Sequence, residues 1–409
     1  MIKKILCLLL LTLLLPISME AAAYQPKEVR GVWISTVYHL DYPSSPTTDP
    51  AQLQRQADEI LDQCVAMGMT DVFFQVRPSG DALYASNIFP WSKYLTGQSG
   101  SAPAEGFDPL NYWVSGAHNR NLRLHAWINP FRAALSESDF ESLSADSPAK
   151  QNPQWVVHHS DNRVYYNPGL PQVRQMVVDG VTEILERYQV DGIHLDDYFY
   201  PDASFDDEAA YKEFGQDGQS KEDWRRNNID LLISQLGETV RGAGVSFGVS
   251  PAGIWANQST HPEGSQTSGK ETYTSMYADT RKWVKEGWLD YICPQIYWEI
   301  GHSAADYATL VQWWADTVRD TGVKLYVGMA DYKVAENTWD GVQEIQRQLE
   351  LNQTFSQIVG EVHFRYGSLA GTPQLRQLYA SRYHMTSQQV KFPDSFAGAY
   401  IQGIDGYFY

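Results

Sequence analysis

The chain alternates strand-like and helix-like segments eight times between Glu28 and Tyr383. Each strand-like segment is a short apolar run, and each helix-like segment carries apolar residues at three- and four-residue spacing. Strands that alternate regularly with helices predict a parallel sheet, and eight such units close into a (β/α)8 barrel. We therefore predict an α/β protein with a single TIM-barrel domain over residues 24–384.

The predicted strands are apolar runs that suit burial on both faces of a parallel sheet. They cover Val29–Ser35, Thr70–Val76, Leu122–Ile128, Val190–Asp196, Val245–Ser250, Tyr291–Ile296, Lys324–Met329 and Ile358–Phe364. The predicted helices cover Ala51–Met67, Pro109–Arg120, Pro171–Tyr188, Lys221–Gly242, Met276–Glu286, Ala304–Thr321, Asp340–Leu351 and Pro373–Tyr383. Residues 385–409 remain as a short, aromatic-rich C-terminal extension.

The connections between these segments are unequal in length. Those that follow the second to fifth strands are long and rich in Gly, Pro, Ser, Asn and Trp, whereas the helix-to-strand connections have only a few residues. Long irregular loops in a compact domain are usually functional. Because all of them belong to one rim, they predict a cleft at the carboxyl ends of the strands.

The first 23 residues have the features of a secretory signal peptide. Lys3 and Lys4 precede the apolar run Ile5–Leu15, which is too short to span a bilayer comfortably, and small residues up to Ala23 offer a cleavage site. We expect residues 1–23 to be removed and the mature protein to be exported, either periplasmic or secreted. No later segment is long and apolar enough to predict a membrane span.

Charge and cysteine content narrow the possible partners and compartment. The net charge of −18 and the isoelectric point of about 4.9 argue against nucleic acid or an anionic membrane as a partner. After removal of the signal peptide only Cys64 and Cys293 remain. We expect two buried free thiols, with a disulfide between them as the alternative.

The fourth predicted strand ends in two adjacent carboxylates, Asp196 and Asp197, followed by three aromatic residues. Side chains at the carboxyl ends of barrel strands point into the mouth of the barrel. Cleavage of a glycosidic bond requires one ionised carboxylate and a second carboxyl that delivers a proton to the leaving oxygen. The alternative is that the two aspartates cap a following helix or turn.

Polar and aromatic residues also follow the other strands. The candidate binding residues are Trp33, Gln75, Arg77, Asp81, His125, Trp127, Asn129, Arg132, His194, Tyr198, Gln295, Tyr297 and Trp298. Amides and imidazoles suit sugar hydroxyls or an acetamido group, and aromatic rings can pack on the apolar face of a pyranose. For the second catalytic carboxyl we consider Glu299 and Asp331, with Asp81 as a third candidate.

No metal or cofactor is predicted. The chain has no His-x-x-x-His pair at ligand spacing, and the pair His158-His159 is interpreted as an incidental part of a loop. It also has no Gly-rich phosphate loop and no Gly-x-Ser-x-Gly elbow. A deacetylase or esterase, which normally needs a metal triad or an activated serine, is therefore disfavoured.

Six motifs resemble those of the glycosyl-hydrolase-like ten family. They are EVRGVWIST (28–36), DVFFQVRPSGDALY (71–84), HAWINPFR (125–132), DGIHLDDYFYP (191–201), VSPAGIW (249–255) and PQIYW (294–298). The resemblance implies an exported bacterial (β/α)8 glycoside hydrolase, with peptidoglycan glycan strands stripped of peptide as a substrate class. The alternative is a barrel that binds a glycan without cleaving it.

The segment that begins at Asp191 also resembles the DGxDxDxE signature of chitinase-type barrels. Asp191 and Asp196 match this signature, but Tyr198 stands where that family has its catalytic glutamate. If the substrate carries an N-acetyl group, that group could act as the nucleophile. Retaining, inverting and substrate-assisted mechanisms all remain open at this point.

Overall fold

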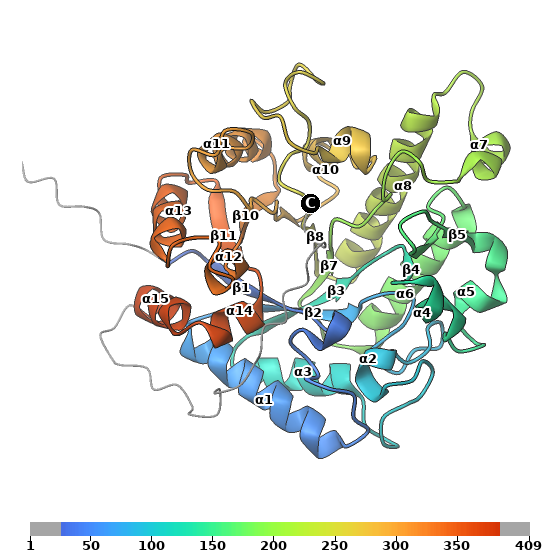
Figure 1. Cartoon of the computed structure of the whole chain (residues 1–409), viewed down its shortest axis with the longest axis horizontal. Coiled ribbons are helices and arrows are strands. Elements are labelled where there is room, and N and C mark those ends of the chain that lie inside the picture. Colours follow the sequence, from blue (N-terminus) through green and yellow to red (C-terminus); the bar gives the residue numbers. More distant parts are fainter. Residues whose placement is uncertain (1–25, 385–409) are drawn as a thin grey trace, which may run out of the picture.

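Eight parallel strands close into a barrel with helices around it (Figure 1) in the computed structural model, which describes residues 26–384. The strands are β1 (Val29–Ile34), β2 (Asp71–Arg77), β3 (Arg123–Ile128), β7 (Gly192–Leu195), β8 (Ser246–Val249), β9 (Tyr291–Ile292), β10 (Lys324–Met329) and β11 (Ile358–His363). They follow chain order around the barrel, and β11 pairs with β1 to close it. The predicted (β/α)8 fold is confirmed. The predicted signal peptide, residues 1–23, and the C-terminal extension, residues 385–409, lie outside the described residues.

The main helices cover the outside of the barrel. They are α1 (Pro50–Ala66), α3 (Pro109–His118), α6 (Pro171–Arg187), α8 (Lys221–Gly242), α10 (Thr280–Lys285), α11 (Tyr307–Val318), α13 (Gln343–Gln353) and α15 (Pro373–Tyr383). Local sequence explains where several of them begin. The Asp49 carboxylate accepts from the Ala51 N–H at 2.9 Å, and the Asp108 carboxylate accepts from the Asn111 N–H at 3.2 Å. A proline follows each of these capping residues, so both helices begin with a side-chain cap and a preset backbone.

Short elements that the prediction did not contain lie within the loops. The helical ones are η1 (Val37–His39), α2 (Lys93–Thr96), α4 (Glu137–Glu141), α5 (Pro148–Gln151), η2 (Pro153–Trp155), α7 (Glu208–Phe214), α9 (Thr272–Ser275), α12 (Tyr332–Ala335) and α14 (Tyr366–Gly371). A small antiparallel sheet is formed by β4 (Arg132–Ala134), β6 (Val164–Tyr166) and β5 (Val156–His158), in that order. Each of these three strands has only three residues, which is too short for a hydrophobic periodicity to predict it from the sequence.

The sixth barrel strand is shorter than predicted. The prediction covered Tyr291–Ile296, whereas β9 contains only two residues. Pro294 has no N–H to donate to a ladder, and beyond it the chain keeps only single bridges from Gln295 to Ala252 and Gly328. The remaining residues of the run therefore bend into the loop that follows.

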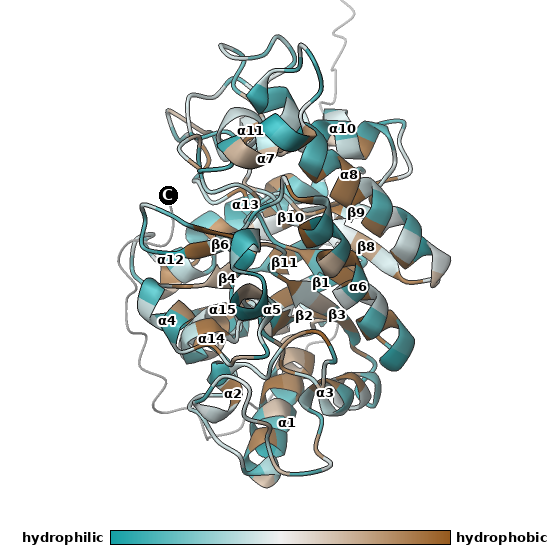
Figure 2. Ribbon diagram, turned by 90° about the vertical axis from the view of Figure 1, so that its right-hand side faces the viewer, coloured by the Kyte–Doolittle hydropathy of each residue, from teal (hydrophilic) through white to brown (hydrophobic). Residues whose placement is uncertain are grey.

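Hydrophobic residues fill the space between strands and helices. Figure 2 shows them concentrated on the central strands, while hydrophilic residues cover the outer loops. Cys64 and Cys293 are both buried and free, which confirms the prediction of two unpaired thiols. Among the described residues, no helix is long and apolar enough to cross a membrane.

Candidate functional site

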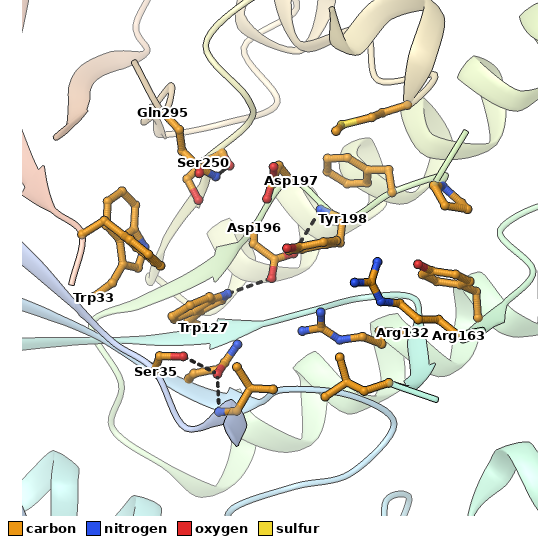
Figure 3. Close-up of a pocket in the computed structure, with 18 of the residues that line it drawn as sticks. Trp33, Ser35, Trp127, Arg132, Arg163, Asp196, Asp197, Tyr198, Ser250 and Gln295 are labelled. Atoms are coloured by element: carbon orange, nitrogen blue, oxygen red, sulfur yellow. Dashed lines mark hydrogen bonds between the residues drawn. The ribbon is translucent and has the colours of Figure 1, made fainter. Parts of the chain in front are cut away.

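A pocket of about 370 Å³ opens at the carboxyl ends of the barrel strands (Figure 3). Its walls come from the segments that follow β1, β3, β7, β8 and β9, and from the small sheet β4-β6-β5. This is the face at which TIM barrels carry their active sites. The long loops therefore surround the cleft where the sequence predicted one.

Asp196 lies in the floor of this pocket, directly after β7, with only 3 % of its surface exposed. Its Oδ2 accepts hydrogen bonds from Trp127 Nε1 at 3.1 Å and from Asn129 Nδ2 at 3.2 Å, and its Oδ1 accepts from the Tyr198 N–H at 3.3 Å. Donors from the end of β3 thus hold the carboxyl in place. The next helix, α7, begins at Glu208, so the aspartate pair does not cap a helix.

The two adjacent aspartates have different surroundings. Burial, and to a smaller extent the negative charge of Asp197, raise the pKa of Asp196 to about 7. The charge of Arg132 and the hydrogen bond from Trp127 act in the opposite direction. Asp197 lines the same pocket but is only partly buried. At neutral pH the floor of the pocket therefore contains a carboxyl group that is much more readily protonated than an ordinary aspartate.

Arg132 brings a fixed positive charge to the pocket wall. Its Nε and Nη2 donate to the carbonyl oxygen of Pro78 at 3.0 and 2.8 Å. Its guanidinium carbon lies 4.8 Å from the centroid of the Tyr198 ring. The backbone N–H of Arg132 donates to Asn129 Oδ1 at 2.9 Å, so the arginine and the asparagine that contacts Asp196 position each other.

His194 supports the aromatic side of the pocket from below. Trp33 donates its Nε1 hydrogen to His194 Nε2 at 3.2 Å, and His194 Nδ1 lies 3.0 Å from the Tyr291 hydroxyl. Burial lowers the pKa of His194 well below its usual value, and the nearby His125 lowers it further. A neutral imidazole that accepts at Nε2 donates from Nδ1, so His194 orients Trp33 rather than facing a ligand.

Two predicted glutamines line the pocket with their amide groups engaged. Gln75 Oε1 accepts from the N–H groups of Thr36 and Val37 at 2.9 and 3.0 Å. Gln295 Nε2 donates to the Ser250 carbonyl oxygen at 2.8 Å. Both side chains therefore fix the loops that form the pocket, and the predicted Tyr297 adds an aromatic ring to the wall.

The three other predicted carboxyl groups lie outside the pocket. Asp331 is buried against His363 Nδ1 at 2.9 Å and accepts a hydrogen bond from Tyr379. Asp81 is buried and accepts from the Ser79 N–H at 3.2 Å, and Glu299 is near Lys333. Asp197 is therefore the acid that the structure places beside Asp196. Within residues 26–384, no three His, Cys, Asp or Glu side chains are grouped so that they could hold a metal ion.

Three predicted binding residues also lie away from the pocket. The Arg77 guanidinium lies 3.5 Å from the centroid of the Phe89 ring, outside the barrel, because the register of β2 shifts between Gln75 and Arg77. His125 is inside the barrel but nearer its amino end, where its Nε2 lies 3.0 Å from an Asp71 oxygen. Trp298 is partly buried beyond the pocket lining.

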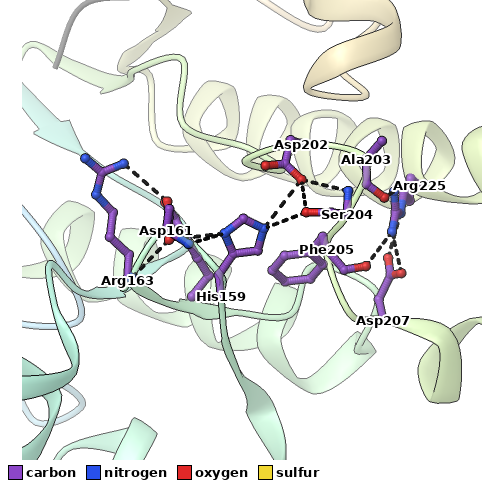
Figure 4. A network of polar contacts seen from close by, with 10 residues as sticks. His159, Asp161, Arg163, Asp202, Ala203, Ser204, Phe205, Asp207 and Arg225 are labelled. Carbon is purple, nitrogen blue, oxygen red and sulfur yellow. Dashed lines mark hydrogen bonds and ion pairs between the residues drawn. The ribbon is translucent and has the colours of Figure 1, made fainter. Parts of the chain in front are cut away.

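A network around His159 joins two walls of the pocket (Figure 4). His159 Nδ1 lies 3.1 Å from Asp161 and its Nε2 lies 3.4 Å from Asp202, and both aspartates line the pocket. Arg163, another lining residue, pairs with Asp161 at 3.3 Å. Asp161 belongs to the β5–β6 hairpin, whereas Asp202 belongs to the loop after β7.

The loop after β7 is anchored a second time at its far end. Arg225 of α8 donates from Nε and Nη2 to the two oxygens of Asp207 at 2.8 and 2.7 Å.

The interpretation of His158-His159 as incidental does not hold for His159, which links two loops of the pocket. The signal that it missed was a hairpin pattern in residues 156–166, two runs rich in valine and tyrosine on either side of Ser-Asp-Asn.

The chain is similar in sequence to known proteins. The Glycosyl hydrolase-like 10 family matches residues 28–343. The chain is 39% identical over 383 residues to the glycosyl hydrolase YngK of Bacillus subtilis (strain 168), which covers 91% of this chain and 74% of that protein. It is 41% identical over 376 residues to the glycosyl hydrolase DigH of Escherichia coli (strain K12), covering 85% of each.

Solved structures show the same fold at low identity. The PgaB (BpsB) glycoside hydrolase domain of Bordetella bronchiseptica superposes with a TM-score of 0.57 at 15% identity, covering 89% of this chain and all of that one. An endo-1,4-beta-D-mannanase of Thermotoga petrophila RKU-1 gives a TM-score of 0.52 at 12% identity, covering 83% and 88%. At these identities the likeness concerns the barrel fold alone.

Proposed function

The chain belongs to the glycosyl hydrolase-like 10 family, and on that premise we propose that it is a glycoside hydrolase. Its substrate is a bacterial cell-wall or related N-acetylated polysaccharide. The observation that carries this proposal is the unequal pair Asp196 and Asp197 in one pocket. In glycoside hydrolysis one carboxyl donates a proton while the other stays ionised. Different environments, which give the two groups different pKa values, allow this division of roles.

In the proposed mechanism Asp196 is the proton donor. The carbonyl oxygen of the substrate's own acetamido group forms a bond to the anomeric carbon as the bond to the leaving oxygen breaks. The leaving oxygen takes the proton of Asp196, while Asp197 accepts the acetamido N–H and stabilises the positive charge of the cyclic intermediate. Water then opens this intermediate and returns a proton to Asp196, so the anomeric configuration is retained.

The position of the two acids supports substrate assistance. Asp196 and Asp197 are neighbours at the end of one strand, so they reach a bound sugar from the same side of the pocket. An inverting enzyme needs its two carboxyls well apart, with room for a water between them. The other acids of the pocket, Asp161 and Asp202, are bound to His159.

The pocket lining supports a polysaccharide substrate. Trp33, Trp127, Tyr198 and Tyr297 supply aromatic surface for the apolar faces of sugar rings. We propose that the substrate is the glycan of peptidoglycan, which lies outside the cytoplasmic membrane. The predicted signal peptide supports this location, in the periplasm or secreted.

The test is cleavage of defined glycans. Intact peptidoglycan, peptidoglycan stripped of peptide, and chitin oligosaccharides are incubated with the protein, and the soluble fragments are identified by mass spectrometry. Asp196→Asn and Asp197→Asn should each lower turnover by at least about a hundredfold. Glu299→Gln, a control outside the pocket, should keep full activity.

Two outcomes would contradict the proposal. Full activity of both aspartate variants on a glycan that the wild type cleaves would remove the assignment of the acids. Binding of these glycans by calorimetry, with no new reducing ends from any of them, would indicate a glycan-binding barrel instead.

A further inference from the structure

Tyr38 presents an exposed aromatic ring at the rim of the pocket. Three large hydrophobic side chains among residues 26–384 are exposed: Tyr38, Val65 and Leu231. Of these three, only Tyr38 lines the pocket, and 38 % of its surface is accessible. Exposed aromatic surface that continues a polar, aromatic cleft is a feature of ligand-binding sites.

The backbone at Tyr38 is held in an unfavourable conformation. Tyr38 has a φ of 55° and His39 a φ of 57°, so two consecutive non-glycine residues are in the left-handed region. For residues with bulky side chains this conformation is uncommon, and it persists only where the surroundings impose it. Such outliers cluster at ligand sites, so the outlier itself points to a function.

Hydrogen bonds on both sides impose this conformation. Before Tyr38, the Gln75 side chain binds the N–H groups of Thr36 and Val37. After it, the Asp41 carboxylate accepts from the Ser35 N–H at 2.8 Å and from the Gly367 N–H at 2.7 Å. The loop is therefore tied to β2 and to the segment after β11.

The ring of Tyr38 also has a rigid support. The buried Tyr94 lies edge-on to it, with centroids 6.1 Å apart, and Tyr94 packs in the same way against His39 at 5.5 Å. His39 Nδ1 lies 2.9 Å from the Pro43 carbonyl oxygen. The position of the ring is thus set before any ligand arrives, which lowers the entropic cost of binding.

We propose that Tyr38 is a stacking platform for a further pyranose ring of the same glycan strand. This inference rests on the proposed function. The pocket volume of about 370 Å³ is near the lower limit of small-ligand sites, about 300–1,000 Å³, so a polymer must extend over the rim. An N-acetylhexosamine unit beyond the cleaved bond would place its apolar face against the Tyr38 ring.

The informative variant is Tyr38→Asn, because asparagine tolerates the left-handed region and the loop should therefore keep its conformation. For glycan strands of several disaccharide units, its KM should rise about fivefold with kcat unchanged. For the shortest cleaved fragment, which has no further unit to stack on the ring, the rise in KM should be clearly smaller. Tyr38→Phe should behave as the wild type, and Leu231→Ala, an exposed apolar control on α8, should have no effect.

Three results would overturn the inference: an unchanged KM for long strands in Tyr38→Asn, an equal change for short and long substrates, or a Tyr38→Phe variant as impaired as Tyr38→Asn. Calorimetry tests the same contact through the binding affinity for uncleaved glycan strands. Here Asp196→Asn is compared with the double variant that also carries Tyr38→Asn. If the wild type cleaves no glycan, the proposed hydrolysis fails, whereas this binding measurement still decides the role of Tyr38.

Discussion

Trp127 donates its indole N–H to Asp196 across 3.1 Å, which joins the ends of β3 and β7 in the floor of the pocket. The same indole supplies part of the aromatic wall. One residue therefore shapes the surface that meets a sugar ring and also stabilises the ionised form of the proposed proton donor.

This hydrogen bond predicts how activity depends on pH. A proton donor must be protonated, so kcat/KM should be high below the pKa of Asp196, about 7, and fall above it. Trp127→Phe removes a donor that favours the carboxylate, so the alkaline limb should move to higher pH. Trp298→Phe, which changes an indole outside the pocket, is the control, and a limb that stays in place in Trp127→Phe would contradict this account.

Asp196 should also make the fold less stable at alkaline pH. Its pKa in the folded protein is raised from 3.8 to about 7, so the folded state holds a proton that the unfolded state has lost between these values, and stability falls as pH rises through this range. Asp196→Asn removes the ionisation. Between pH 4 and pH 8 its stability should rise relative to that of the wild type by about 3–4 kcal/mol, the linkage expected for a shift of about three pKa units. Urea unfolding at the two pH values tests this, and a constant difference would refute the cause.

The His159 network should matter for binding more than for turnover. His159→Gln disrupts the contacts to Asp161 and Asp202, so the β5–β6 hairpin and the loop after β7 lose their link. We expect KM for glycan strands to rise several-fold, with little change in kcat. His158→Gln is a matched control because that side chain is exposed and binds Glu137 on the outside. A kcat effect as large as that of Asp196→Asn would instead place His159 in the chemistry.

The barrel below the aspartate pair has no space for a larger residue at Gly192. A Cβ there would lie 2.0 Å from His125 Nδ1, and His125 is itself held by Asp71. Gly192→Ala should therefore destabilise the fold by about 1–3 kcal/mol or more. Gly242→Ala, at the end of α8 with no atom within 4 Å of the added carbon, should change stability by less than about 0.5 kcal/mol. Thermal unfolding of the two variants compares them directly, and equal melting temperatures would contradict the packing argument.

Hydrophobic patterns were sufficient to predict the barrel and its carboxyl face. Each strand is a short, mostly apolar run, and the segments between them have helical spacing, so the order of elements follows from the residues alone. The rule that strand ends face the site predicts that Asp196, Asp197, Trp127 and Arg132 share one pocket, as they do.

The predictions that placed residues wrongly have physical causes. Asp331 follows Met329 by two residues, and alternate residues of a strand point to the same side. Because Met329 packs against the helices, this alternation could have placed Asp331 outside the barrel. Arg77 could not be placed in this way because the register shift in β2 reverses the alternation. His159 was missed because its partners, Asp161 and Asp202, come from two different loops, and no periodic pattern reports such a contact.

The two-residue strand β9 has a consequence for motion in the barrel. Its pairing with β8 and with β10 covers two positions on each side, whereas β2 and β3 are registered over six. Backbone amides along this seam should exchange with solvent sooner than those of the other strands, because few ladder bonds must open together. Gln295 and Tyr297 lie just beyond this short pairing and form part of the pocket wall. A glycan bound to that wall would oppose the local opening of the strand, so it should slow the hydrogen exchange of these amides.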